Sequence, residues 1–176
     1  MCKFNSSKTF SIIHLNIRSI VKHIDEFRVI LAMLEFKFDI ICISESKILK
    51  DYDPKIDINI DGYQSPVGTP TESAKGGVLI YVKNGITFKP RNDLALYKKK
   101  ELESFFIEII NPKETNSVVG VIYRHPCMNE QIFNDDYLKK ITDILSLENK
   151  KYLFLVTLIL TYLMSQTIMK HSVSSI

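Results

Sequence analysis

The stretch Phe38-Asp39-Ile40-Ile41-Cys42-Ile43-Ser44-Glu45-Ser46-Lys47 contains an unbroken run of apolar or small residues that a carboxylate follows at once. A run of this length, rich in β-branched residues, is typical of a strand buried on both faces. Such a strand cannot hold an unpaired charge in its middle, so we predict that Glu45 lies where the strand leaves the core. A carboxylate held there is well placed to bind a hard cation. The alternative is a solvated loop residue.

The overall composition is that of a globular protein. The chain has 176 residues, of which 45% are hydrophobic and 24% charged, enough for one domain or part of a larger one. The net charge of +3 is compatible with a nucleic-acid partner but does not argue for one. Cys2, Cys42 and Cys127 lie far apart, so neither a zinc site nor a disulfide framework is indicated. We expect an intracellular location, in the nucleus or cytoplasm.

Apolar periodicity predicts the secondary structure around the central stretch. We predict strands near residues 10–16, 39–44, 78–83, 104–110, 117–123 and 151–156, and helices near residues 20–36 and 130–147. Ser19 is of a type that caps helices. The first helix has apolar positions at three- and four-residue spacing, namely Ile24, Phe27, Ile30, Leu31 and Leu34. The first strand, this helix and the central strand form a strand–helix–strand unit.

The connections suggest how the remaining strands pair. Residues 51–71 form a long polar loop, with short strand pieces expected around residues 56–60. Asn84-Gly85 favours a tight hairpin turn, with Ile86–Lys89 as the return strand. Asn111–Asn116 connects a second predicted hairpin. This pattern predicts an α+β fold of mostly antiparallel sheets packed face to face, with helices outside.

Four stretches, taken in chain order, resemble a known family. They are His14-Leu15-Asn16-Ile17-Arg18-Ser19, Ile43-Ser44-Glu45-Ser46, Gly76-Gly77-Val78-Leu79-Ile80-Tyr81-Val82 and Gly120-Val121-Ile122-Tyr123-Arg124-His125-Pro126. The set resembles the endonuclease/exonuclease/phosphatase superfamily, and within it the endonuclease domain of non-LTR (LINE-type, jockey-like) retrotransposons. The resemblance implies a four-layer α/β sandwich and Mg²⁺-dependent hydrolysis of a phosphodiester in DNA. It implies no small-molecule cofactor and no membrane partner.

The resemblance also implies roles for single residues. Glu45 matches the carboxylate that binds Mg²⁺, Asn16 the amide that helps position metal and phosphate, and Tyr123 the tyrosine whose hydroxyl approaches the scissile phosphate. An amide and a phenol add hydrogen bonds without adding negative charge. From the residues alone, Asn16 could instead form a turn and Tyr123 could be a core aromatic.

Three further residues are candidates for contacts with nucleic acid. Arg18 stands where abasic-site endonucleases carry an acid, and an arginine there fits the retrotransposon branch. Arg124 and His125 follow the tyrosine of the last motif and could contact backbone phosphate. His125 could also be a solvated loop histidine. We expect His14, on a strand, to be a satisfied core or edge residue.

Two stretches that the family needs do not occur in this sequence. They are a Gly-Asp-Phe-Asn-like stretch at a strand end and a later Ser-Asp-His stretch, which orient and activate the attacking water. Val156-Thr157-Leu158-Ile159 stands where the first is expected, and Val156–Met164 can be encoded so that reading one base earlier gives Gly-Asp-Phe-Asn. We therefore expect an N-terminal tail over residues 1–9, a partial, inactive domain over residues 10–155 and a frameshifted, non-native tail over residues 156–176.

Two alternative functions stay open at this point. The chain could be a non-catalytic remnant that binds metal or nucleic acid weakly. It could also be a tail-anchored membrane protein, with Tyr152–Met169 as a span of about the minimum length for a crossing. Polar residues such as Thr157, Thr161 and Gln166 dilute that span and disfavour the membrane interpretation.

Overall fold

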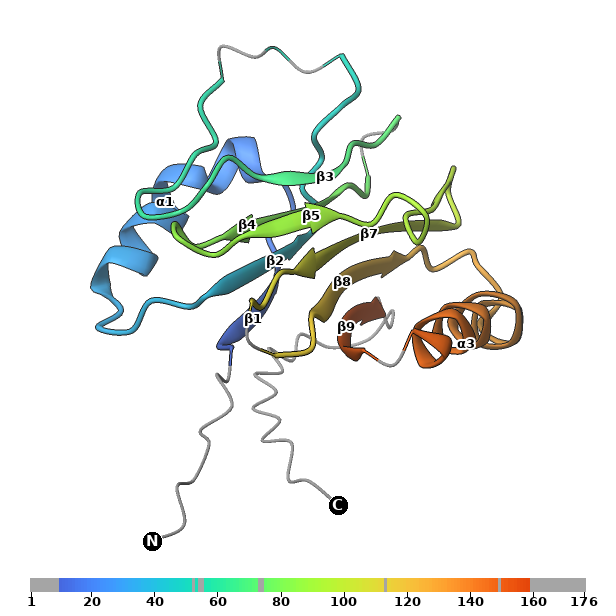
Figure 1. Cartoon of the computed structure of the whole chain (residues 1–176). Helices are drawn as coiled ribbons and strands as arrows, with labels where there is room; N and C mark the ends of the chain where they lie inside the picture. Colours follow the sequence, from blue (N-terminus) through green and yellow to red (C-terminus); the bar gives the residue numbers. More distant parts are fainter. Residues whose placement is uncertain are drawn as a thin grey trace, which may run out of the picture.

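Strand β2 (Ile40–Ser44) is buried along its whole length, as its continuous apolar run predicts. It lies between β1 (Ile12–Asn16) and β4 (Val78–Val82) in the same sheet. The computed structural model describes residues 10–158, apart from residues 52, 54, 55, 73, 74, 113 and 149. Figure 1 shows the two sheets in the middle of the molecule, with α1 beyond one sheet and α3 beyond the other.

Each sheet contains one parallel strand–helix–strand unit. The first sheet has the strand order β1-β2-β4-β3, and α1 (Ile20–Met33) connects the parallel strands β1 and β2. The second has the order β5-β7-β8-β9, with β6 paired to β7, and a helical segment connects the parallel strands β8 and β9. The other strands are β3 (Val67–Thr69), β5 (Phe88–Pro90), β6 (Tyr97–Lys98), β7 (Leu102–Ile109), β8 (Ser117–Arg124) and β9 (Lys151–Leu158).

Alternate residues of the central strands belong to different apolar cores, because successive side chains of a strand point to opposite faces. Ile40 and Cys42 of β2 join the core between the sheets, whereas Ile41 joins the core beneath α1. On β7, Phe105 lies between the sheets and Phe106 lies beneath the second helical layer. The fold is therefore a four-layer α/β sandwich, as predicted.

The Asn84-Gly85 turn does not form the predicted hairpin. Strand β4 pairs with β2 and β3, so neither of its edges is left for a return strand. The segment after the turn, β5, pairs instead with β7 of the other sheet. The turn therefore carries the chain from one sheet to the other. The second predicted hairpin, β7 and β8, is confirmed.

The strand pieces predicted around residues 56–60 are also absent, since this stretch has irregular structure. Its backbone is held from the side by Arg28, whose Nε and Nη2 donate to the carbonyl oxygen of Asn59 at 3.0 and 2.7 Å. Ile60 packs into the core beneath α1. Side-chain bonds thus replace the pairing that a strand would provide.

Helix α1 differs from the prediction at both of its ends. Ser19 makes no capping bond through its side chain and has a φ of 133°. The helix ends at Met33 instead of residue 36, and Leu34 is already extended. Ile30 is 55% exposed, because it lies one residue, about 100° of helix rotation, away from Leu31 on the packed face. The prediction that Ile30 and Leu34 face the core was wrong.

The second predicted helix is present over Glu130–Leu147 but is interrupted. It consists of α2 (Glu130–Ile132), a π-helical segment η1 (Phe133–Leu138) and α3 (Lys139–Leu147). The side chain of Asn129 caps its start and accepts hydrogen bonds from the backbone amides of Gln131 and Ile132. Buried side chains from η1 and α3 cover the outer face of the second sheet.

The last described strand, β9, continues to Leu158, beyond the predicted end at residue 156. Residues 156–158 of the expected non-native tail therefore continue a strand, and residues 159–176 lie outside the described residues. The first part of the suggested membrane anchor is this same strand. Across the described part of the chain, no helix is both long and apolar enough to cross a membrane.

Candidate active site

Three of the predicted site residues come together where their strands end. Asn16 is the last residue of β1, Glu45 follows β2 directly, and Tyr123 is the penultimate residue of β8. Nδ2 of Asn16 donates a hydrogen bond to Oε1 of Glu45 at 2.9 Å. The hydroxyl of Tyr123 donates to the same oxygen at 3.4 Å. Residues from both sheets thus converge on one carboxylate.

The loops that carry Asn16 and Glu45 are strained. Four residues other than glycine have positive φ in these loops, namely Arg18 (54°), Ser19 (133°), Glu45 (52°) and Lys47 (55°). Such conformations cost about 1–3 kcal/mol each and cluster at functional sites. Backbone bonds hold the loops together, from the Ile17 amide to the Ser44 carbonyl at 3.1 Å and from the Ile20 amide to the Ser46 carbonyl at 2.9 Å. The strained backbone therefore lowers the stability of the fold while it fixes the position of Glu45.

Asn16 and Tyr123 each have the structural role that the sequence allowed, and each also contacts Glu45. Oδ1 of Asn16 accepts a bond from the Arg18 amide at 3.2 Å and so forms a local turn, while its amide nitrogen holds Glu45. The ring of Tyr123 belongs to the core between the sheets, while its hydroxyl reaches the site. Burial, and then the neighbouring Glu45 carboxylate, raise the pKa of Tyr123. Its phenol is therefore protonated at neutral pH.

A hydrogen-bonded group of side chains lies behind Glu45. The hydroxyl of Thr157 on β9 donates to Oγ of Ser44 at 2.8 Å and lies 2.8 Å from Nε2 of His14. Burial lowers the pKa of His14 to about 4, so this ring is neutral at pH 7. His14 is a satisfied interior residue, as expected. Position 157 consequently lies beside the residue that precedes Glu45.

Of the three residues predicted to contact nucleic acid, only Arg18 is exposed near the site. Arg124 is buried on the opposite face of β8, where Nη1 donates to the Met128 carbonyl at 2.6 Å and the guanidinium lies over the Phe133 ring. His125 is buried too. Neither side chain has a position from which it could contact phosphate, because the alternation of β8 and the turn after it direct both inward.

Glu103 is a polar residue beside the site that the sequence analysis missed. It lies in β7 directly opposite Tyr123 of β8, and only 1% of it is exposed. Its carboxylate accepts a hydrogen bond from the Gly77 amide and lies 3.4 Å from Nε2 of His125. The signal in the sequence was a pair of acids, Glu103 and Glu108, in a strand whose other residues are mostly apolar.

The site offers few ligands for a metal ion. Glu45 supplies a carboxylate that is only partly buried, and Asn16 supplies an amide oxygen. Within the described residues, no group of three or more histidine, cysteine, aspartate or glutamate side chains could hold a metal ion. The oxygen donors suit a hard cation that keeps several of its waters, and they do not suit zinc.

Comparisons with known proteins identify the fold. No family model matches the sequence, and no curated protein matches it. Among solved structures, the human Nocturnin catalytic domain is similar, with a TM-score of 0.55 and 14% identity, and the match covers 84% of this chain and 62% of that one. An AP endonuclease from Leishmania major has a TM-score of 0.50 and 17% identity, with 66% and 40% covered.

Two structures from Neisseria add to this comparison. A 3′-5′ exonuclease from Neisseria meningitidis has a TM-score of 0.50 and 16% identity, with 83% and 56% covered. A second structure, of the same protein under the description 3′ phosphatase and bound to a product DNA hairpin, has a TM-score of 0.51 and 15% identity, with 84% and 57% covered. The sandwich is of the endonuclease/exonuclease/phosphatase type. The chain spans between 40% and 62% of the length of these structures.

Proposed function

We propose that this chain is the metal-binding part of a DNA endonuclease domain of the non-LTR retrotransposon kind, with an incomplete catalytic set. The convergence of Asn16 and Tyr123 on the Glu45 carboxylate is the observation that supports this best. The strained loops around Glu45 add to it. The fold of the similar nucleases and phosphatases fits phosphodiester chemistry, and the DNA-bound phosphatase among them fits a DNA partner.

Mg²⁺ is the ion that the donor set fits best. Glu45 would hold it, with the Asn16 amide oxygen beside it, since Mg²⁺ takes oxygen ligands and is often bound through one or two carboxylates. When bound, the ion would neutralise charge that develops on phosphate oxygens. The hydroxyl of Tyr123 donates its only proton to Glu45 in this structure and would turn that proton toward the phosphate once the ion is bound to the Glu45 carboxylate. The buried ring fixes the position of the hydroxyl. The amide of Asn16 holds the Glu45 carboxylate in place beside the ion and the phosphate.

Glu45→Gln is expected to weaken Mn²⁺ binding by at least about 10-fold, because it removes the charge at the centre of the site while keeping its shape. Mn²⁺ serves as the probe for Mg²⁺, and free Mn²⁺ can be counted by its electron paramagnetic resonance signal. Glu114→Gln, which changes an exposed carboxylate in the β7–β8 connection, is the matched control and should bind like the unchanged chain. Equal Mn²⁺ affinity in both variants would contradict the proposed metal site.

Lysines beside the site provide the phosphate contacts that Arg124 and His125 cannot. Tyr97 of β6 lies opposite Glu103 in β7, which in turn lies opposite Tyr123, so it is about 10 Å from the site across two strand spacings. Nζ of Lys50 lies 5.2 Å from the Tyr97 ring centre. Lys98 and Lys99 follow Tyr97 directly and are more than half exposed. Basic groups around an aromatic ring suit a nucleic-acid strand.

The double change Lys98→Glu and Lys99→Glu is expected to weaken binding to a short DNA hairpin and to lower its salt dependence by about one unit of slope per lysine. Fluorescence anisotropy at several salt concentrations measures both quantities. Lys139→Glu with Lys140→Glu changes two exposed lysines on α3 by the same charge and serves as the control. An identical loss in the two double variants would mean that only net charge matters.

A second candidate is a remnant that binds metal or nucleic acid weakly and cuts nothing. The site favours it because Glu45 is the one carboxylate that Asn16 and Tyr123 contact, and the described residues contain no group of three or more potential metal-binding side chains. Both candidates predict that the chain as printed nicks supercoiled plasmid no faster than Glu45→Ala. They differ in whether restoring the reading frame would give an active nuclease, which the last prediction of the Discussion tests.

A further inference from the structure

Glu103 is a buried carboxylate surrounded by hydrogen-bond donors. Oε2 accepts a bond from the Gly77 amide, and Oε1 lies 3.1 Å from Oγ1 of Thr71 and 3.4 Å from Nε2 of His125. A buried charge is tolerated only when such groups satisfy it. Glu103 therefore connects the segment from Thr71 to Gly77 with His125, which follows β8.

The first connection leads to the loop of Glu45. Gly76 and Gly77 both have positive φ, 91° and 83°, and a Cβ at Gly76 would lie 2.3 Å from Oε1 of Glu103. Only glycine lets the backbone approach the carboxylate so closely. The carbonyl oxygens of these two glycines accept bonds from the amides of Lys47 and Ser46 at 2.9 and 3.0 Å. Glu103 thus holds, through the glycines, the residues that follow Glu45.

The second connection leads to Tyr123. The imidazole of His125, held by Glu103, packs edge-on against the Tyr123 ring with the ring centres 4.6 Å apart. The same tyrosine donates to Oε1 of Glu45. Both connections therefore lead to Glu45. The first acts through the backbone that follows it, and the second acts through Tyr123, which donates a hydrogen bond to its carboxylate.

We propose that Glu103 is a positioning residue, which holds the Glu45 turn and the Tyr123 ring in the relative position that the metal site needs. It touches neither metal nor phosphate. A glutamine at position 103 would keep one acceptor oxygen for the Gly77 amide but would replace the second carboxylate oxygen, which lies near Thr71 and His125, with an amide donor. Residues that orient a metal ligand typically cost 10–100-fold in affinity when changed. This inference rests on the proposed function in one respect, namely that the Glu45 carboxylate binds a metal ion.

Glu103→Gln is expected to speed hydrogen exchange at the Ser46 and Lys47 amides by about 10-fold more than at the rest of the core. Glu108→Gln is the matched control, because Glu108 is an equally buried carboxylate on the same strand, about 17 Å away. A merely structural carboxylate would raise exchange throughout the core in both variants. If Glu103→Gln prevents folding, Glu103→Asp withdraws the carboxylate from Gly77 by one methylene and should give the same local effect.

Metal binding provides the second readout. We expect Glu103→Gln to weaken Mn²⁺ binding about 10-fold and Glu108→Gln to leave it unchanged. Faster exchange at Ser46 and Lys47 with unaltered Mn²⁺ affinity would overturn the link between position and metal binding. Equal exchange profiles in the two variants would overturn the positioning role itself. If the unchanged chain shows no Glu45-dependent Mn²⁺ binding, the proposed function fails, while the exchange profiles still decide the role of Glu103.

Discussion

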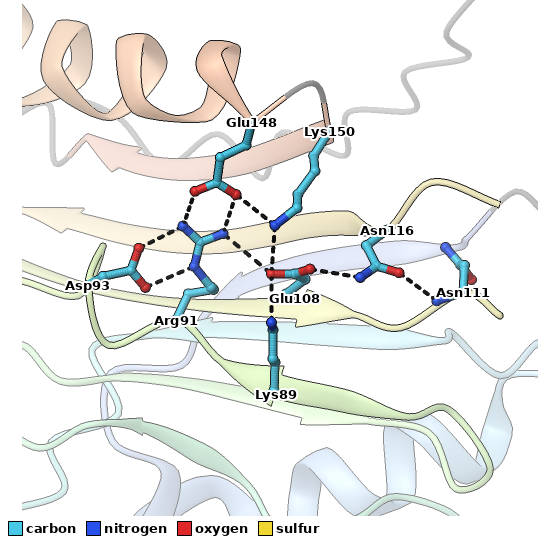
Figure 2. A network of polar contacts seen from close by, with 8 residues as sticks. All are labelled: Lys89, Arg91, Asp93, Glu108, Asn111, Asn116, Glu148 and Lys150. Carbon is cyan, nitrogen blue, oxygen red and sulfur yellow. Dashed lines mark hydrogen bonds and ion pairs between the residues drawn. The ribbon is translucent and has the colours of Figure 1, made fainter.

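Arg91→Met is expected to lower the free energy of unfolding by about 2–3 kcal/mol, because it removes a buried cation that three carboxylates share, of which Glu108 is also buried. Figure 2 shows Arg91 between Asp93, Glu148 and Glu108. Its guanidinium donates to Asp93 at 2.8 and 2.6 Å, to Glu148 at 2.9 and 2.5 Å, and to Glu108 at 3.4 Å. Its side chain is only 8% exposed and that of Glu108 only 2%, so water cannot replace the bond between these two.

This network connects the end of the second helical layer to the second sheet. Lys150, just before β9, donates to Glu148 at 2.7 Å and to Glu108 at 3.0 Å, and Asn116 donates to Glu108 at 2.8 Å (Figure 2). The free energy of unfolding can be measured by urea titration. Lys98→Met is the control, since Lys98 pairs with Glu101 on the surface, where ion pairs contribute at most about 1 kcal/mol. Equal losses in the two variants would refute the role of burial.

The pH dependence of the same network has a definite sign. Hydrogen bonds from Arg91 lower the pKa of Asp93, and bonds from Arg91 and Lys150 lower that of Glu148. Groups with a lowered pKa stabilise the fold above the pKa of the unfolded chain, about 4.3 for glutamate. That stability is lost as the pH falls further. The difference in stability between the unchanged chain and Arg91→Met should therefore shrink below about pH 4.

The central strands were predictable because both of their faces are buried. In a sandwich with covered sheets, a continuous apolar run indicates a strand that is buried on both faces. The strands β2 and β4 could therefore be predicted from the sequence. The partner of the segment after Asn84-Gly85 did not, because a turn dipeptide specifies local geometry and not which sheet has a free edge. The exposure of Ile30 was missed for a similar reason, since helix periodicity does not say how wide the packed face is.

The three site residues were predictable as side chains at strand ends, and the structure adds the hydrogen bonds that join them. The ordered motifs carried Asn16, Glu45 and Tyr123, and these three meet. Arg124 and His125 were chosen by adjacency to Tyr123, but adjacent strand residues point to opposite faces. Glu103 escaped notice because its role depends on Gly77 and His125, from two other segments. Contacts between distant segments leave no local pattern in a sequence.

A chain restored to the alternative reading frame is expected to nick supercoiled plasmid with Mg²⁺ at least about a thousand-fold faster than the chain as printed. Each lost group that acts on the transition state typically costs about 10²–10³-fold in rate. The frame one base earlier would put glycine, aspartate and phenylalanine at positions 156, 157 and 158. A longer product should then continue to Ser-Asp-His, so that the water-orienting and general-base groups return together.

The structure supports this expectation through the place of position 157. Thr157 lies opposite Tyr123 in the parallel pair of β8 and β9, and its hydroxyl lies 2.8 Å from Oγ of Ser44, the residue before Glu45. An aspartate at position 157 would therefore bring a second carboxylate to the edge of the metal site, where a threonine now makes a neutral hydrogen bond.

Two results decide the matter. Sequencing the gene around the codon for Val156 should give a frame that reads Gly-Asp-Phe-Asn and later Ser-Asp-His once a single base is restored upstream. The restored protein should lose its nicking activity when Glu45 is changed to alanine and also when the new aspartate at position 157 is changed to asparagine. The idea fails if no such frame opens. It also fails if the restored chain nicks no faster than its own Glu45→Ala variant. The residues that meet at Glu45 would then not be part of a nuclease active site.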